Sequence, residues 1–138
     1  MKISLSIIVF GFLFASCKKV PGCTDLHALN YEYSAEVDNG TCYYSSTTFY
    51  AKYGYYSGIP INQIDIAVDG SAIGSINSVY PSGPGNCSAT GTVTYEHYDG
   101  DNHDWNSTVY LANGAVVYGS GTVKSSSSID CKKMNVTN

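Results

Sequence analysis

The first seventeen residues constrain the fold most, because they decide in which compartment the rest of the chain folds. One basic residue, Lys2, precedes an uncharged and mostly apolar run over 3–15, and small residues then lead to Cys17. The run is too short to span a bilayer and has the three parts of a secretory signal. The sequence therefore predicts export and removal of residues 1–16, so that the mature chain folds where cysteines can oxidise.

The residues before Cys17 resemble the lipobox of bacterial lipoproteins, which is an aliphatic residue followed by two small residues and a cysteine. Ala15 and Ser16 match this pattern, whereas Phe14 stands where leucine is usual. The resemblance implies that Cys17 carries acyl chains such as palmitate, that residues 17–22 form a tether, and that the cell envelope, at the outer membrane, is the location. The alternatives are an ordinary signal cleaved nearby, which leaves Cys17 unpaired, and an uncleaved membrane anchor.

The cysteine count fits a lipidated Cys17, because the chain has five cysteines and lipidation would leave four for pairing. These four are Cys23, Cys42, Cys87 and Cys131. Three pairings are open, and we expect 23–42 and 87–131, because the first two bracket one short segment and the other two lie in the β-rich remainder. Such loops stabilise a folded chain by roughly 3 and 4 kcal/mol in the chain-entropy model.

Composition narrows the class of protein further. Loss of Lys2 with the signal changes the formal charge from −4 to −5, and the chain has no arginine, so bidentate recognition of phosphate is absent. The remaining lysines form no basic face, and we do not expect nucleic acid as a partner. Thirteen tyrosines with abundant Thr, Val, Ile and Gly favour an all-β chain whose only helix is in the removed signal.

Residues 22–43 resemble a short motif of exported Bacteroidota proteins, G-C-x-D-x-x-A-x-N-Y-x-x-x-A-x-x-D-[DN]-G-[ST]-C. The resemblance implies a small disulfide-clasped module, residues 23–44, and no activity. Leu26 stands where proline is usual, and Glu32-Tyr33 replaces the usual Asn-Pro. The positions that match the motif are Cys23, Asp25, Ala28, Asn30, Tyr31, Ala35, Asp38, Asn39, Gly40, Thr41 and Cys42.

Two interpretations of the oxygen-bearing side chains in this module stay open. They could bind calcium, which prefers hard oxygen ligands. They could instead cap a helical turn ending at Leu29 and form the turn at 38–40, because short polar side chains accept hydrogen bonds from exposed amides. We favour the second interpretation, since the D-x-D-x-D-G spacing of a calcium loop is absent. The residues concerned are Asp25, Asn30, Asp38 and Asn39.

Residues 47–138 predict an antiparallel β-sandwich of about seven short strands separated by turns. Asp69-Gly70 and Asn113-Gly114 are hairpin signals. The V-D-G-x-x-x-G stretch at 68–74, with a later disulfide, resembles β-sandwich domains of Bacteroidota lipoproteins with unassigned function, and it implies the fold alone. The expected strands cover 47–56, 64–68, 73–80, 90–98, 105–111, 115–123 and 131–136.

We do not expect an enzyme, because the sequence has no G-x-S-x-G, H-E-x-x-H, glycine-rich phosphate loop or C-x-x-C motif. One polar cluster, at 96–105, could bind a divalent metal through His97 and His103. Its aspartates, Asp99, Asp101 and Asp104, could bind calcium. The alternative is a solvated turn in which His97 packs beside Tyr95. Glycosidase chemistry through Glu96 and an aspartate is the weakest alternative.

A binding role is the more natural prediction, because aromatic side chains present large surfaces at low entropy cost. Tyr50, Tyr56, Tyr98 and Trp105 could form a sugar-stacking platform, or they could pair across strands, and for Trp105 we favour a place in the core. The sequence thus predicts a lipid-anchored envelope protein with a non-catalytic binding or structural accessory role. The alternative is a carbohydrate-binding accessory lipoprotein of a glycan-uptake system.

Overall fold

The computed structural model describes residues 18–126 and 130–137. Within these ranges the chain forms strands and no helix, which confirms the all-β prediction. No described segment is a helix long and apolar enough to cross a membrane. The strands are β1 (Pro21–Gly22), β2 (Val37–Asp38), β3 (Ser46–Tyr50), β4 (Tyr55–Tyr56), β5 (Ile59–Val68), β6 (Ser71–Ile76), β7 (Val93–Glu96), β8 (Asn102–Leu111), β9 (Val116–Lys124) and β10 (Cys131–Asn135).

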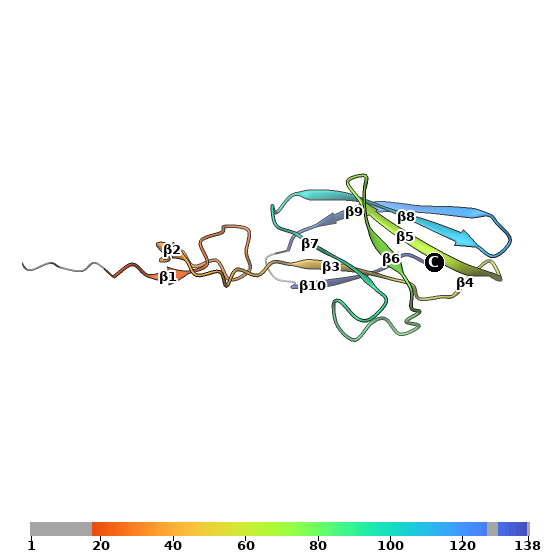
Figure 1. The fold of residues 1–138 in the computed structure, drawn as a ribbon, viewed down its shortest axis with the longest axis horizontal. Coiled ribbons are helices and arrows are strands. Elements are labelled where there is room, and N and C mark those ends of the chain that lie inside the picture. The colour runs from red at the N-terminus through yellow and green to blue at the C-terminus, as the bar shows by residue number, and fades with distance from the viewer. Residues whose placement is uncertain (1–17, 127–129, 138) are drawn as a thin grey trace, which may run out of the picture.

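Two sheets pack face to face and form the sandwich (Figure 1). The larger sheet has the order β4-β5-β8-β9, with β6 also pairing with β5, and the smaller one has the order β10-β3-β7. The short parallel pair of β1 and β2 lies in a separate module at one end of the sandwich (Figure 1). The described chain is therefore elongated, with the residues nearest the predicted lipid site at one tip.

The predicted strand ranges differ from the observed ones at several ends, because β5 begins at Ile59, β6 covers Ser71–Ile76 and β7 covers only Val93–Glu96. Two further differences concern the pairing of strands. The range 47–56 is split, because β3 ends at Tyr50 and β4 joins the other sheet. In addition, β10 pairs with β3 in parallel, from Cys131 beside Ser46 onward, whereas we predicted antiparallel pairing throughout. The physical reason is that the chain leaves β9 in the larger sheet and enters the smaller sheet, so β10 does not form a hairpin with its predecessor.

Both predicted hairpin turns are present. Asp69 and Gly70 have φ values of 48° and 76°, which is the type I′ geometry that matches the twist of the flanking strands β5 and β6. At the second turn the N–H of Leu111 donates to the carbonyl of Ala115 at 2.9 Å, and Gly114 adopts φ 83°. A three-residue loop ending in a left-handed glycine is a common hairpin connection.

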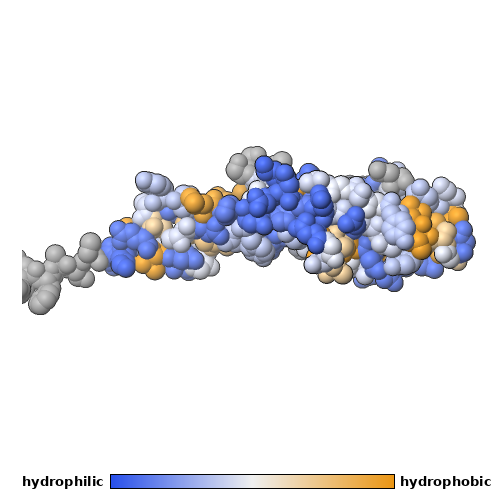
Figure 2. Space-filling view, turned by 90° about the horizontal axis from the view of Figure 1, so that it is seen from above, coloured by the Kyte–Doolittle hydropathy of each residue, from blue (hydrophilic) through white to orange (hydrophobic). Residues whose placement is uncertain are grey.

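The core lies between the sheets and is built by alternating side chains, since every second residue of a half-buried strand faces inward. Figure 2 shows one long side of the molecule, where hydrophilic residues occupy the middle and hydrophobic ones lie toward the two ends. Trp105 is 9% exposed and its ring lies 5.5 Å from that of Phe49. The buried hydrophobic cluster consists of Phe49, Ala51, Ile64, Ile66, Val68, Ile76, Val93, Trp105, Val109, Leu111 and Val123.

Both predicted disulfides are present. Cys23–Cys42 closes the N-terminal module, and Cys87–Cys131 ties the loop before β7 to the first residue of β10. The second bridge matters for the fold because β10 pairs only with β3 among the described strands. A covalent tie at its first residue therefore supplements five pairs of the parallel ladder.

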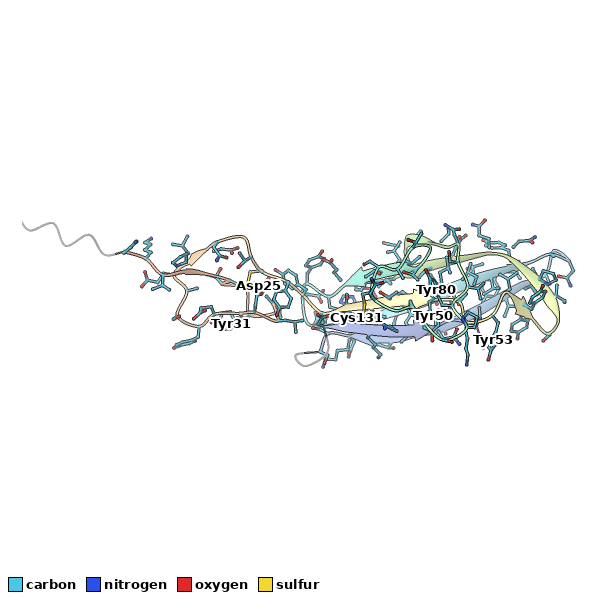
Figure 3. All side chains as sticks on the ribbon, turned by 90° about the horizontal axis from the view of Figure 1, so that it is seen from below. Asp25, Tyr31, Tyr50, Tyr53, Tyr80 and Cys131 are labelled. Atoms are coloured by element: carbon cyan, nitrogen blue, oxygen red, sulfur yellow. A yellow bond between two sulfur atoms is a disulfide. The ribbon has the colours of Figure 1, made fainter. Side chains whose placement is uncertain are left out.

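The N-terminal module contacts the end of the sandwich through Tyr44. The Tyr44 ring packs edge-on against Tyr98 at 4.7 Å, and its hydroxyl donates to the Asp25 carboxylate at 2.7 Å. This hydrogen bond raises the pKa of Tyr44 to about 12. Figure 3 shows Asp25 inside the module and Cys131 where the sandwich begins.

Candidate binding groove

One cavity of the sandwich lies between the free edges of β9 and β10. Among the described strands, β9 pairs only with β8 and β10 only with β3, so neither has a partner on its outer side. The cavity has a volume of about 330 Å³. We call it the groove, and it is lined by Tyr56, Trp105, Ser107, Val109, Val117, Tyr118, Gly119, Ser120, Asn135, Val136 and Thr137.

Two buried polar atoms beside the groove have no hydrogen-bond partner among the described residues. They are the hydroxyl oxygen of Ser107, which is 1% exposed as a residue, and the indole N–H of Trp105. Such an atom costs roughly 1–3 kcal/mol relative to a paired one. None of the side chains that line the groove carries a charge. A ligand that brings neutral hydrogen-bonding groups would therefore recover energy that the free protein leaves unused.

The glycines of β9 shape this wall of the groove. Gly119 and Gly121 lie directly opposite Ser107 and Trp105 in the β8–β9 ladder. A Cβ at Gly119 would come within 2.6 Å of the Ser107 hydroxyl oxygen, and one at Gly121 within 2.8 Å of the Trp105 indole nitrogen. The two glycines thus make room for a large ring and a hydroxyl that point from β8 across the inner face of β9.

The backbone of β9 also has hydrogen-bonding groups on its free edge. In an antiparallel ladder, opposed residues alternate between hydrogen-bonded and non-hydrogen-bonded pairs. Leu111 is hydrogen-bonded to Ala115. Hydrogen-bonded pairs recur at every second position of the ladder, so Ser107–Gly119 is a hydrogen-bonded pair as well. The intervening residues Tyr118 and Ser120 therefore direct their N–H and C=O groups toward the groove side of the strand.

A second, basic cavity continues the space between β9 and β10 toward the N-terminal module. It has a volume of about 160 Å³ and is lined by Ser45, Ser46, Lys124, Ser126 and Lys132. Lys124 is the last residue of β9, and Lys132 is the second residue of β10. Neither lysine forms an ion pair within the described ranges. This end of the gap between the strands is therefore positively charged in a chain of net charge −4.

The four aromatic residues predicted as a sugar platform do not lie together. Tyr56 lines the groove, whereas Trp105 belongs to the core. Tyr98 is 57% exposed and contacts Tyr44 at the junction with the N-terminal module. Tyr50 lies close to Gly83 of the loop outside the smaller sheet, and Figure 3 shows it near Tyr80 in the middle of the sandwich.

The predicted calcium ligands of the N-terminal module are occupied with its turns. Asp38 accepts from the N–H of Gly40, and Asn39 accepts from the N–H and hydroxyl of Thr41. Asn30 donates to the Thr41 carbonyl at 2.7 Å and accepts from the Tyr43 N–H. Asp25 accepts from the His27 N–H and the Tyr44 hydroxyl. These bonds are those of the turn-capping interpretation, although a turn and no helix follows Asp25.

The predicted acidic cluster is organised around His103. Its Nδ1 lies 2.6 Å from a carboxylate oxygen of Asp69, and its Nε2 lies 2.8 Å from one of Asp99. The hydrogen bond to Asp69, followed by Asp99, raises the pKa of His103 against the opposing effect of burial. When protonated, the ring donates from both nitrogens and offers no lone pair to a metal. Asp101 is exposed, and Asp104 accepts from the hydroxyl of Thr122.

His97 is fully enclosed and has a different role. Its Nε2 lies 2.9 Å from the hydroxyl of Thr47, and its Nδ1 has no partner among the described residues. Burial, and then the charge of His103, lower the pKa of His97, so this ring stays neutral. The ring packs edge-on against Tyr95, as in the packing interpretation. In the described part of the chain, no three His, Cys, Asp or Glu side chains are arranged to hold a metal ion.

Sequence reasoning missed two features of these sites. Asp69 was assigned only to a turn, yet its carboxylate binds both the ring of His103 and the N–H of Asp104. The glycines Gly119 and Gly121 were not singled out, although glycine at alternate positions of a strand signals that something approaches its backbone closely. The predicted lipid site, Cys17, lies outside the described residues.

Comparison with known proteins gives no relative: no family model matches the chain, and neither a curated protein nor a solved structure is detectably similar to it.

Proposed function

We propose that the chain is a lipid-anchored protein of the cell envelope with a non-catalytic binding role, and that the groove between β9 and β10 receives its ligand. The observation that carries the proposal is the unpartnered Ser107 hydroxyl beside a cavity of about 330 Å³. Cavities of this size accept small ligands or single side chains of a larger partner. The lipobox-like residues before Cys17 support the anchor and the outer membrane location.

The arrangement of titratable groups supports a role without catalysis. The two ring nitrogens of His103 lie beside the carboxylates of Asp69 and Asp99, and this arrangement does not activate a nucleophile. Within the described residues, the one hydrogen-bond partner of the His97 ring is the hydroxyl of Thr47, which is fully buried and out of reach of a substrate. General acid–base chemistry needs a group within hydrogen-bond reach of the reacting proton. Neither histidine offers such a group at a surface.

Carbohydrate binding, as an accessory of a glycan-uptake system, is the second candidate function. One observation favours it: Tyr56 and Tyr118 line the uncharged groove, and aromatic rings stack on the C–H faces of sugars. The wide separation of Tyr50, Tyr98 and Trp105 removes the platform on which the sequence argument relied. A sugar would have to use the groove alone.

Mass spectrometry of the mature N-terminus tests the anchor. We expect acyl chains on Cys17 and loss of membrane fractionation in Cys17→Ala, because two or more chains are needed for stable anchoring and one binds only marginally. An unmodified mature terminus in protein taken from membranes would contradict this.

A binding comparison tests the second half of the proposal. The mature domain is presented to a glycan array and to the defined peptides described below. Binding to either class supports a binding role if a groove variant with an intact fold loses that binding. Absence of binding to both classes contradicts it.

A further inference from the structure

We infer that the ligand of the groove is an extended, acidic peptide segment, which adds to the larger sheet as a strand beside β9. This inference rests on the proposed binding function and names its partner. It is carried by three properties of one surface: a free strand edge, an uncharged cavity beside that edge, and two lysines at its end.

The free edge supplies the affinity. Strand β9 runs over Val116–Lys124 and pairs with β8 in an unbroken register without a bulge. It contains no proline and no charge before Lys124, so it lacks the features that natural edges use to prevent pairing. The outward N–H and C=O groups of Tyr118 and Ser120 match another extended backbone. Strand addition to such an edge is an established mode of peptide recognition.

The cavity supplies a site for one side chain. Alternate residues of an added strand face inward, about 6.6 Å apart along the strand. An inward side chain beside Gly119 would enter the cavity, which Val117 and Val136 line together with Ser107. A small side chain with a hydroxyl, such as threonine, could pair with the Ser107 hydroxyl, which has no hydrogen-bond partner among the described residues.

The lysines select the charge of the peptide. Lys124 and Lys132 line the basic cavity at the end of β9 and form no ion pair within the described ranges. From Gly119 to Lys124 the strand advances five residues, or roughly 16 Å at about 3.3 Å per residue. A carboxylate about five residues from the inserted side chain would therefore meet the lysines. A neutral sugar makes no use of this charge.

The test uses the mature full chain and three blocked peptides of alternating threonine and valine. The first carries glutamate at both ends, so that a carboxylate can reach the lysines whether the peptide pairs with β9 in parallel or antiparallel orientation. The second carries lysine at both ends. The third is the glutamate peptide with a central proline, which cannot complete a ladder. We expect the glutamate peptide to bind at least ten-fold more tightly than either control in isothermal titration calorimetry.

A pair of variants at one position separates backbone pairing from side-chain contact. Ser120→Pro removes only the N–H that faces the groove, and Gly119 before it tolerates the restriction that proline imposes. Ser120→Ala removes the side chain and keeps the N–H. We expect Ser120→Pro to bind at least ten-fold more weakly than Ser120→Ala, with thermal melting as the control for folding.

A charge reversal tests the lysines. Lys124→Glu combined with Lys132→Glu should weaken the glutamate peptide at least ten-fold and strengthen the lysine peptide. The inference is overturned by equal binding of both charged peptides, by wild-type affinity in Ser120→Pro, or by groove-dependent binding of a neutral glycan in place of the peptides. A dimer of the wild-type chain that Ser120→Pro dissociates would also overturn it, with a second copy as the occupant. The proposed binding function itself fails only if no probe and no second copy binds.

Discussion

Single residues of β9 decide how the inner face of the larger sheet is filled. Gly121 faces Trp105 across the ladder, and the indole nitrogen would lie 2.8 Å from a Cβ at this position. The indole carbon Cε2 would lie at 3.1 Å, so a rigid ring and not a flexible chain end would have to move. The space beside the groove therefore depends on the absence of a side chain at 121.

We predict that Gly121→Ala destabilises the sandwich by about 1–3 kcal/mol, the usual cost of overpacking a core. Urea unfolding measures the loss. Gly85→Ala is the matched control, because Gly85 has no heavy atom within 4 Å of its Cβ position and no positive φ. Equal stability of the two variants would show that the Trp105 ring does not lie against β9 as described.

His103 connects three segments by charge. Its ring binds Asp69 in the turn between β5 and β6 and Asp99 in the loop before β8, with Tyr95 and His97 packed around it. Its folded pKa is raised, so its stabilisation is complete below the unfolded pKa of about 6.5 and is lost as pH rises through the folded value. The pKa values of Asp69 and Asp99 are lowered, so their contribution is lost as pH falls below about 4.

We predict that the difference in unfolding free energy between the wild type and His103→Gln is largest between about pH 4 and 6.5. It should shrink at higher pH as the native ring loses its proton. The lowered pKa of His97 acts in the opposite direction, because the folded state resists protonation of this ring at low pH. The part of this effect due to burial is present in both proteins and cancels, whereas the smaller part due to the charge of His103 is absent from the variant and reduces the difference at low pH. Urea unfolding over a pH series checks this, and a difference that grows above pH 7 would refute it.

At the scale of elements, the sequence predicts what is local. Asp69-Gly70 and Asn113-Gly114 identify hairpins because turn residues and flanking strands are neighbours in the chain. The parallel pairing of β10 with β3 could not be read in this way, because it joins residues about eighty positions apart through a change of sheet. The groove was missed for the same reason, since its walls come from β8, β9 and β10.

The aromatic residues show a second limit of the sequence. Alternation assigns a side chain to one of two faces of a strand, but it does not tell which face another sheet, a loop or a module covers. Tyr50, Tyr56 and Tyr98 lie in three different environments. Trp105 was the exception, because its size alone favoured the core.

The disulfides differ in what they hold, which leads to a prediction for paired double variants. Replacing Cys87 and Cys131 with serine opens a span of 44 residues and releases β10, and we expect a loss of about 4 kcal/mol. Replacing Cys23 and Cys42 with serine opens a span of 19 residues, and we expect a loss of about 3 kcal/mol. This loss destabilises the N-terminal module. Differential scanning calorimetry should show the sandwich transition shifted mainly by the first pair. Equal shifts would mean that the module and sandwich unfold as one unit.

At the scale of the whole molecule, the order of parts along the chain corresponds to their order in space. The N-terminal module begins at Pro21, four residues after Cys17, and a chain of that length reaches at most roughly 14 Å. With Cys17 lipidated, the module would lie at the membrane surface and hold the sandwich beyond it (Figure 1). The groove, between the free edges of β9 and β10, would then face the solution beside the membrane and not the lipid.

Amide hydrogen exchange measured by NMR reports most directly on the groove and its free edge. In the free protein, the amides of Tyr118 and Ser120 should exchange rapidly, whereas those of Gly119 and Gly121, bonded to β8, should be protected. Addition of the glutamate peptide should slow exchange at Tyr118 and Ser120 and leave the ladder to β8 unchanged. Protection of Tyr118 and Ser120 already present in the free monomer, or no change at these amides on peptide binding, would contradict the account.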